Sequence, residues 1–278
     1  MTKQNIKQFP SIDEVRTFWN TNPVHSVEFP NRNDQKAYFD FVDTLRWTDN
    51  EKWAEKVFYD LSGNEDTKIL DAGCGIGVFT RYYARKGFQV DAIDITERAL
   101  EETKRSLELN NLKATLHQGS VEELPFKDDT FDYIVSNGVV HHTPNTEKAV
   151  AEFLRVLKPG GVATVCVYYK NILLKEPLWQ ITKRILPKIL KKSAGRENML
   201  YISTPEELAR TYDGNNTPIA RIYSKADADE LFKSFIILKR EPHFFPSRFL
   251  RFIPRGGIMH MLLDRYFGFL IYYLIKKP

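Results

Sequence analysis

The chain has 278 residues, of which 42% are hydrophobic and 27% are charged, and its formal net charge is +4. This composition excludes a disordered chain, a collagen-like chain and a small disulfide scaffold. Two cysteines, Cys74 and Cys166, are too few for a metal cluster and suit a reducing cytoplasm. The length suits one elaborated domain as well as two, and we predict a single domain over residues 1–278.

The sequence contains no segment typical of a secreted or membrane-spanning protein. The first residues lack the apolar centre of a signal peptide. The longest apolar run, residues 266–275, has about half the length that a transmembrane helix needs. We therefore predict a cytoplasmic protein without a transmembrane segment.

Basic residues gather in two stretches of the second half. Residues 170–198 have a net charge of +6 and residues 233–278 of +7, which leaves −9 for the remaining residues. Such asymmetry indicates an anionic partner or substrate. The alternative is that these side chains only solvate exposed helices.

Residues 1–62 are predicted to form a helical N-terminal cap. Ser11 and Glu14 make a capping box ahead of an apolar helix, and aromatic-rich helical segments follow near 35–47 and 50–61. Between the first of these helices and the segment at 35–47, the Asn and Pro content of residues 20–26 indicates a loop. We expect that loop to act as a lid over a ligand, or its aromatic residues to belong to an ordinary packed helix. Its candidate residues are Trp19, Asn20 and His25.

From residue 68 onward, short apolar strands alternate with helices. The predicted strands are 68–71, 89–94, 114–117, 131–136 and 162–168. Three helices are predicted: one that follows the first strand and ends near residue 86, and two that cover residues 96–110 and 147–157. This alternation is typical of βαβ units. It predicts an α/β fold with a doubly wound, Rossmann-like, mainly parallel sheet, whose ligand-binding core is residues 63–169.

The alternation stops after Tyr169. Residues 170–223 are predicted to be a basic helical insertion or lid, in which apolar residues recur at helical spacing and a Pro-Glu-Glu segment begins a second helix. The residues with helical spacing are Ile181, Ile185, Ile189 and Leu190, and the second helix begins at Thr204-Pro-Glu-Glu207. Residues 224–278 return to helix and strand, with Ser224 as a helix cap and strands near 235–239 and 267–277.

The last apolar segment has two interpretations. Residues 268–275 have the composition of a strand buried on both faces, which we prefer to a membrane anchor. Before it, in residues 244–261, aromatic side chains interleave with Arg248, Arg251 and Arg255. This pattern suits either core-facing aromatics with solvated arginines or contact with an anionic lipid surface.

The segment that carries chemistry is a glycine loop between the first strand and the next helix. Gly73, Gly75 and Gly77 let the backbone approach a ligand, with helix N–H groups directed at it. Dinucleotide-binding folds share such a loop. They require a small residue where this chain has Val78, however, and Asp71 would repel a pyrophosphate and attract an ammonium group.

Asp94 completes this pattern. It ends the second strand, 17 residues after Gly77, where a carboxylate accepts hydrogen bonds from both hydroxyls of a ribose. The loop and Asp94 together predict a nucleoside that carries a zwitterion.

These residues and four further motifs, in this order and spacing, resemble the class I S-adenosylmethionine-dependent methyltransferases, in particular the small-molecule and quinone-pathway branch. The further motifs are Glu123-Leu-Pro-Phe126, Phe131-Asp132, His141-His142-Thr-Pro144 and Leu157-Lys-Pro-Gly-Gly161. The resemblance is specific over residues 67–168 and weaker over 224–277. It implies a seven-stranded sheet with an antiparallel last strand, S-adenosylmethionine as methyl donor and S-adenosylhomocysteine as product.

The resemblance also implies roles for individual residues. The glycine loop with Asp71 holds the methionine moiety, Asp94 holds the ribose, and Ile95 packs on the adenine. The predicted cofactor-binding residues are Asp71, Gly73, Cys74, Gly75, Gly77, Asp94, Ile95, Ser120, Val121 and Asn137. Many relatives have Asp at the position of Ser120, which is a weaker, neutral acceptor here, and Glu122 is a neighbour that could compensate.

The carboxyl ends of the later strands carry the catalytic candidates, because ligands bind at that edge of an open α/β sheet. His142 or His141 is the candidate base, since imidazole titrates near neutral pH, and simple packing is the alternative. Tyr168 either orients a substrate or fills the sheet edge. The six histidines show no paired ligand spacing, so we predict no metal.

The sequence thus predicts an enzyme that transfers a methyl group by in-line displacement to a small-molecule acceptor, anionic or lipid-like, selected by the insertion. One alternative is an RNA methyltransferase, which the basic insertion favours and the Ser136-Asn-Gly138 strand end disfavours. Another is a non-catalytic cofactor-binding subunit. Peripheral contact with an anionic membrane is compatible with the charge pattern. The acceptor, its reacting atom and the oligomeric state stay open.

Overall fold

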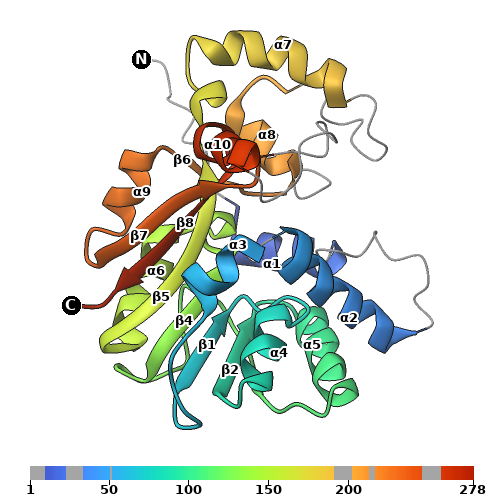
Figure 1. The fold of residues 1–278 in the computed structure, drawn as a ribbon, viewed down its shortest axis with the longest axis vertical. Coiled ribbons are helices and arrows are strands. Elements are labelled where there is room, and N and C mark those ends of the chain that lie inside the picture. The colour runs from blue at the N-terminus through green and yellow to red at the C-terminus, as the bar shows by residue number, and fades with distance from the viewer. Residues whose placement is uncertain (1–9, 23–33, 51, 191–201, 213–216, 246–257) are drawn as a thin grey trace.

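The structure is a computed structural model that describes residues 10–22, 34–50, 52–190, 202–212, 217–245 and 258–278 (Figure 1). Four residues singled out from the sequence, His25, Arg248, Arg251 and Arg255, lie outside these ranges. In the described part of the chain, no helix is long and apolar enough to cross a membrane.

The centre of the molecule is an eight-stranded mixed sheet with the order β3-β2-β1-β4-β5-β8-β7, in which β6 pairs with β5 beside this path. The strands are β1 (Lys68–Ala72), β2 (Gln89–Asp94), β3 (Thr115–Gln118), β4 (Phe131–Asn137), β5 (Leu157–Tyr169), β6 (Ile222–Tyr223), β7 (Ile236–His243) and β8 (Leu270–Lys276). Strands β1 to β5 are mutually parallel, and β8 is antiparallel to both of its neighbours. The predicted Rossmann-like sheet is therefore confirmed, with the two-residue β6 added to the seven expected strands.

The helices follow the predicted alternation. They are α1 (Ile12–Thr21), α2 (Gln35–Thr44), α3 (Lys52–Ala54), α4 (Val78–Arg85), α5 (Glu97–Leu109), α6 (Thr146–Val156), α7 (Leu178–Leu190), α8 (Pro205–Tyr212), α9 (Lys225–Leu231) and α10 (Ile258–Phe267). The chain continues after α2 and α3 as the wider helical turns η1 (Leu45–Asn50) and η2 (Glu55–Tyr59), and η3 (Val140–His142) and η4 (Ile172–Leu174) are single 3₁₀ turns.

The helix starts show why these boundaries are readable from the sequence. The predicted capping box of Ser11 and Glu14 is present at α1, with the Ser11 hydroxyl accepting from the Glu14 N–H at 3.2 Å. Ser224 caps α9 in the same reciprocal manner. Each cap satisfies N–H groups that the first helical turn leaves without a partner.

Alternate residues of the strands face two separate cores. Leu70 of β1 and Ile134 of β4 pack against α6 and α9, whereas Ile69 and Tyr133 face the other side, toward α4 and the N-terminal cap. Figure 1 shows the sheet between these two helical layers. Because both faces are covered, the central strands are mainly apolar. The run at residues 268–275, expected to be a buried strand, contributes β8 between β5 and β7.

A buried ion pair attaches the N-terminal cap to the sheet domain. The Arg81 guanidinium of α4 is fully buried and bonds both carboxylate oxygens of Asp43 in α2, with Nε at 3.0 Å from Oδ2. The same guanidinium donates from Nη1 to the Ile76 carbonyl at 2.6 Å and to the Ser106 hydroxyl at 2.8 Å. One side chain thus connects α2, the glycine loop and α5.

Removing the carboxylate of this pair should be strongly destabilising. We expect Asp43→Ala to lower the free energy of unfolding by about 3–5 kcal/mol, because it leaves a buried guanidinium without its counter-charge. Asp40→Ala in the same helix is the control. Asp40 pairs with Lys36 at 2.7 Å, and both side chains are about half exposed. We therefore expect Asp40→Ala to lower the free energy of unfolding by about 0.5 kcal/mol or less. Urea unfolding of both variants measures the difference, and equal effects would contradict the role of the pair.

Candidate active site

The glycine loop is fixed between the ends of β1 and β2. The N–H groups of Gly73 and Cys74 both donate to the Ile93 carbonyl, at 2.8 and 3.0 Å. Gly73 has φ of 87°, and a Cβ on it would lie 2.3 Å from Cγ2 of Val139. A Cβ on Gly75, in contrast, would meet no atom of the described chain within 4 Å. The loop is therefore tightly packed on one side and presents its backbone to open space on the other.

Asp94 is oriented by the loop that it faces. Its Oδ2 accepts from the Gly75 N–H at 3.0 Å, and its Oδ1 accepts from the N–H and the hydroxyl of Thr96, each at 2.9 Å. Burial raises the pKa of Asp94, and these hydrogen bonds act in the opposite direction. The carboxylate is thus held in one orientation at the carboxyl end of β2.

The loop and Asp94 form one wall of a cleft of about 200 Å³ that is partly open to solvent. Most of the predicted site residues meet in this cleft, and they come from the ends of four elements of the sheet. The predicted residues that line it are Gly73, Cys74, Gly75, Asp94, Ile95, Ser120, Val121, Asn137 and His142. Its largely apolar wall suits an organic ligand.

Asp71 lies beside the cleft and is not part of its wall. Its carboxylate is 2% exposed and accepts a 2.6 Å hydrogen bond from the Thr80 hydroxyl. Burial raises the pKa of Asp71 to about 7, although the bond from Thr80 and the charge of Arg46 lower it. Its predicted contact with an ammonium group stays a prediction. Gly77 also lies outside the wall, as the residue that precedes α4.

His142 is the catalytic candidate that reaches the cleft. Its Nδ1 lies 2.7 Å from the Ile219 carbonyl, and its ring makes an edge contact with Trp19 at 5.0 Å. A carbonyl oxygen only accepts, so in the neutral ring Nδ1 carries the proton and Nε2 carries the lone pair. This is the tautomer in which Nε2 can accept a proton.

His141 and Tyr168 lie behind the cleft. Both are buried, their ring centroids are 4.1 Å apart, and neither lines the cleft. Burial lowers the pKa of His141 well below its ordinary value. Within the described residues, neither ring nitrogen of His141 has a hydrogen-bond partner. Burial thus favours the neutral form of His141, which makes it a poor acceptor of a proton.

The predicted insertion contributes to this site through its last segment. Ile219 bonds His142 as described, the Arg221 N–H donates to the His141 carbonyl at 2.8 Å, and Arg221 Nη2 donates to the Pro144 carbonyl at 2.6 Å. The turn that carries His142 is therefore held by residues distant in sequence. No spacing in the sequence indicated these contacts.

Four residues of the N-terminal cap also line the cleft, namely Ile12, Val15, Trp19 and Arg46. Trp19 lies in the last turn of α1. Of the two interpretations of this residue, the packed helix therefore fits better than the lid loop. Arg46, in η1, has its guanidinium carbon 5.1 Å from the ring centroid of Phe79. Arg46 is not among the predicted site residues, because a lone basic residue in an aromatic-rich helix forms no pattern.

Ser120 is engaged within its own turn. Its hydroxyl accepts from the Glu122 N–H at 3.1 Å. The Glu122 carboxylate accepts from the Asn145 N–H at 2.7 Å and does not line the cleft. Among the described residues, no group of three or more His, Cys, Asp or Glu side chains is arranged to hold a metal ion.

The position of Asp71 gives a prediction for stability against pH. The unfolded chain releases this proton near pH 3.8 and the folded chain near pH 7, so the free energy of unfolding falls as pH rises through this window. We expect Asp71→Asn to raise the free energy of unfolding at pH 8 by about 1–3 kcal/mol. The gain should vanish near pH 4. Thermal unfolding at both pH values measures it, with the exposed Asp66→Asn as control, and a loss of stability at pH 8 would contradict the assignment.

Comparison with known proteins agrees with this geometry. Residues 70–165 match the family model described as a methyltransferase domain. The demethylmenaquinone methyltransferase of Staphylococcus aureus is 32% identical over 152 residues, an alignment that covers 53% of this chain and 61% of the relative. The chain thus spans about three fifths of the length of the curated relatives it matches.

Solved structures share the fold. A protein of Methanosarcina mazei, described as an S-adenosylmethionine-dependent methyltransferase, aligns with a TM-score of 0.52 and 22% identity over 77% of this chain and 94% of its own. The protein PH0226 of Pyrococcus horikoshii aligns with a TM-score of 0.54 and 19% identity, over 90% of this chain and 97% of its own. The [4+2]-cyclase SpnF aligns with a TM-score of 0.53 and 18% identity, over 96% of this chain and 93% of its own. At these identities the likeness establishes the fold alone.

Proposed function

We propose that this chain, whose residues 70–165 match a methyltransferase domain, is a class I S-adenosylmethionine-dependent methyltransferase that methylates a small, lipid-like hydroxylated aromatic molecule of the quinol type. The observation that carries the proposal is the shared cleft. It brings the glycine loop and the oriented Asp94 into one space with His142, whose Nδ1 is bonded to a carbonyl.

The residues present fit the proposed cofactor. Asp94 is oriented for ribose hydroxyls, and the open side of Gly75 leaves room for close approach of the ligand. Arg46 in the wall supplies a positive charge for the carboxylate of a methionine moiety. Ile95 and Val121 give an apolar surface for the adenine.

The chain's own residues would act by position, exclusion of water and proton transfer. Bound S-adenosylmethionine would supply an electrophilic methyl group on a positively charged sulfur, which would leave with the electron pair of the C–S bond as the acceptor bonds the methyl carbon. His142 accepts the hydroxyl proton of the acceptor at Nε2, which makes the acceptor nucleophilic. Trp19 and Asn137 line the same cleft and restrict the orientation of the acceptor.

The acceptor class rests on two supports. The curated relative from Staphylococcus aureus is a demethylmenaquinone methyltransferase by name, and the wall of the cleft around Val15, Trp19 and Val139 is apolar. An apolar wall with few polar groups favours an aromatic, weakly polar substrate over a nucleic acid.

A transfer assay tests the function. Full-length protein and methyl-labelled S-adenosylmethionine are incubated in parallel with a demethylated naphthoquinol, a small phenol or RNA. We expect label only in the naphthoquinol and phenol fractions. Label in RNA would overturn the acceptor class. Cofactor binding without label in any fraction would favour a non-catalytic subunit.

The role of His142 has its own test. We expect His142→Gln to lower kcat by roughly a hundredfold or more, with the affinity for S-adenosylhomocysteine changed less than about threefold. His117→Gln is the control, because His117 pairs with Asp91 on the sheet and does not line the cleft. Equal activity of the two variants would contradict the assignment.

A further inference from the structure

Helix α10 is oriented with its apolar face outward. Its buried side chains are His260 and Asp264, and Leu263 and Phe267 are half-buried. Its exposed side chains are mainly apolar, and Met261, for example, is 62% exposed. The exposed apolar residues are Ile258, Met259, Met261, Leu262 and Tyr266. A surface helix of a globular protein normally has the opposite arrangement.

Polar contacts fix this orientation. Oδ1 of Asp264 accepts from the Phe245 N–H at 2.7 Å, and its Oδ2 lies 3.3 Å from Nδ1 of both His243 and His260. Gly268, which follows the helix, has no room for a Cβ because the His243 backbone approaches too closely. The helix is therefore held by its polar face, and rotation into a buried apolar arrangement would break these contacts.

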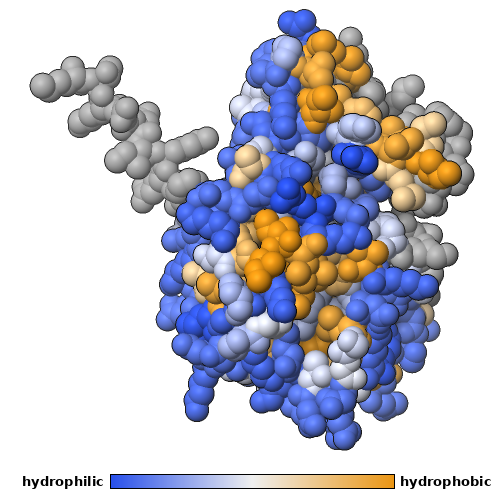
Figure 2. All heavy atoms as spheres, turned by 60° about the vertical axis from the view of Figure 1, so that its left-hand side comes forward, coloured by the Kyte–Doolittle hydropathy of each residue, from blue (hydrophilic) through white to orange (hydrophobic). Residues whose placement is uncertain are grey.

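The apolar surface continues from α10 onto η4 and α7. Asn171, before η4, donates to the carbonyls of Phe267 and Gly268, each at 3.1 Å, and Ile172 is exposed. Helix α7 is attached by buried Trp179, whose Nε1 donates to the Ser203 carbonyl, and it exposes Ile181 at 56%. Figure 2 shows hydrophobic residues gathered on the two projections that carry α7 and α10.

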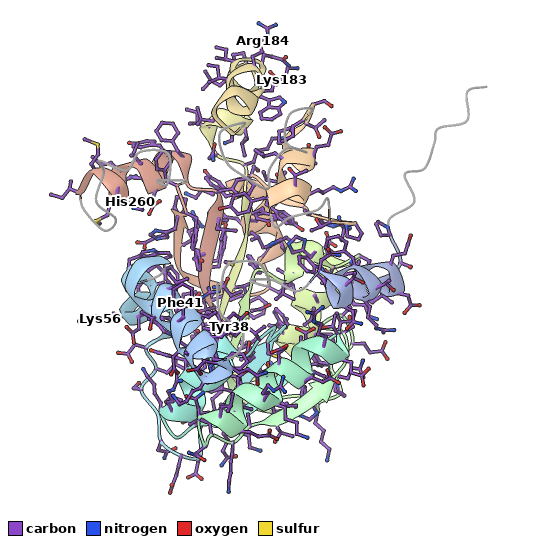
Figure 3. All side chains as sticks on the ribbon, turned by 90° about the vertical axis from the view of Figure 1, so that its right-hand side faces the viewer. Tyr38, Phe41, Lys56, Lys183, Arg184 and His260 are labelled. Carbon is purple, nitrogen blue, oxygen red and sulfur yellow. The ribbon has the colours of Figure 1, made fainter. Side chains whose placement is uncertain are left out.

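The exposed charges on these two helices are positive. Arg265 is the exposed charged residue of α10. On α7, Lys183 is half-exposed and Arg184 exposed, and Figure 3 shows both at the outer end of the molecule. A two-fold contact with a second copy would place like charges against each other. An RNA would leave the apolar side chains without a partner, whereas an anionic lipid surface matches both the charge and the apolar area.

We propose that the outward faces of α10, η4 and α7 form a docking surface for an anionic lipid bilayer. Helix α10 has ten residues, about half the length needed to cross a bilayer, so it lies in the interface. β5 ends at Tyr169, just before η4, which places this surface at the same edge of the sheet as the cleft. The proposal extends the proposed function, since a lipid-like acceptor dissolves in such a bilayer.

Vesicle sedimentation tests the docking surface. Full-length protein is mixed with vesicles of phosphatidylcholine alone or with about one third phosphatidylglycerol, near 0.1 M salt. We expect binding to the anionic vesicles. The double variants Met259→Gln/Met261→Gln and Ile181→Gln/Ile185→Gln should each lower the partition coefficient at least tenfold, because glutamine keeps the helix and removes the apolar contact.

The matched control lies on the edge strand β7, where Ile236 and Leu238 are 49% and 50% exposed. Ile236→Thr/Leu238→Thr should bind vesicles as the unmodified protein does. Binding of all variants to S-adenosylhomocysteine should stay within about threefold, so loss of lipid binding is distinguishable from failure of the proposed function or of folding.

Three outcomes would overturn the docking surface. One is no vesicle binding by the unmodified protein. Another is a dimer in solution that Met259→Gln/Met261→Gln converts to a monomer, which would make the face an interface between copies. The third is binding to anionic vesicles that neither double variant weakens, which would place the lipid contact elsewhere on the molecule.

Discussion

The hydrogen bond between the Gly75 N–H and the Asp94 carboxylate is the contact on which the site depends. It joins the glycine loop after β1 to the end of β2, 3.0 Å from donor to acceptor. Packing of Gly73 against Val139 fixes the same loop from the β4 side. The carboxyl ends of three strands thereby set the position of the backbone that faces the cleft, and a side chain at Gly73 could not be accommodated.

The N-terminal cap completes the cleft and is attached by a second buried contact. Arg81 bonds Asp43 in the cap and the Ile76 carbonyl in the loop, so the cap and the loop are fixed relative to each other. The cap supplies Trp19 and Arg46 to the cleft wall. A buried ion pair is costly unless all its groups have partners, and the partners of Arg81 are shared between these parts.

The sequence predicted the parts of the protein that local rules govern. Alternating apolar strands and helices, the caps at Ser11 and Ser224, and the glycine loop all follow from short-range patterns, and the structure has them at nearly the predicted residues. The sequence could not show that Asp71 lies behind the cleft, that Ile219 fixes the tautomer of His142, or that Arg46 lines the wall. Each depends on contacts between segments that are distant in the chain. The outward apolar face of α10 was also hidden, because helical periodicity does not show which face meets the core.

Isothermal titration calorimetry with S-adenosylhomocysteine tests the central claim most directly. The account predicts binding of one ligand per chain, at least tenfold weaker for Asp94→Asn and unchanged for Asp91→Asn in the same strand. No heat with this ligand or with S-adenosylmethionine, together with clear binding of a nicotinamide dinucleotide, would contradict it.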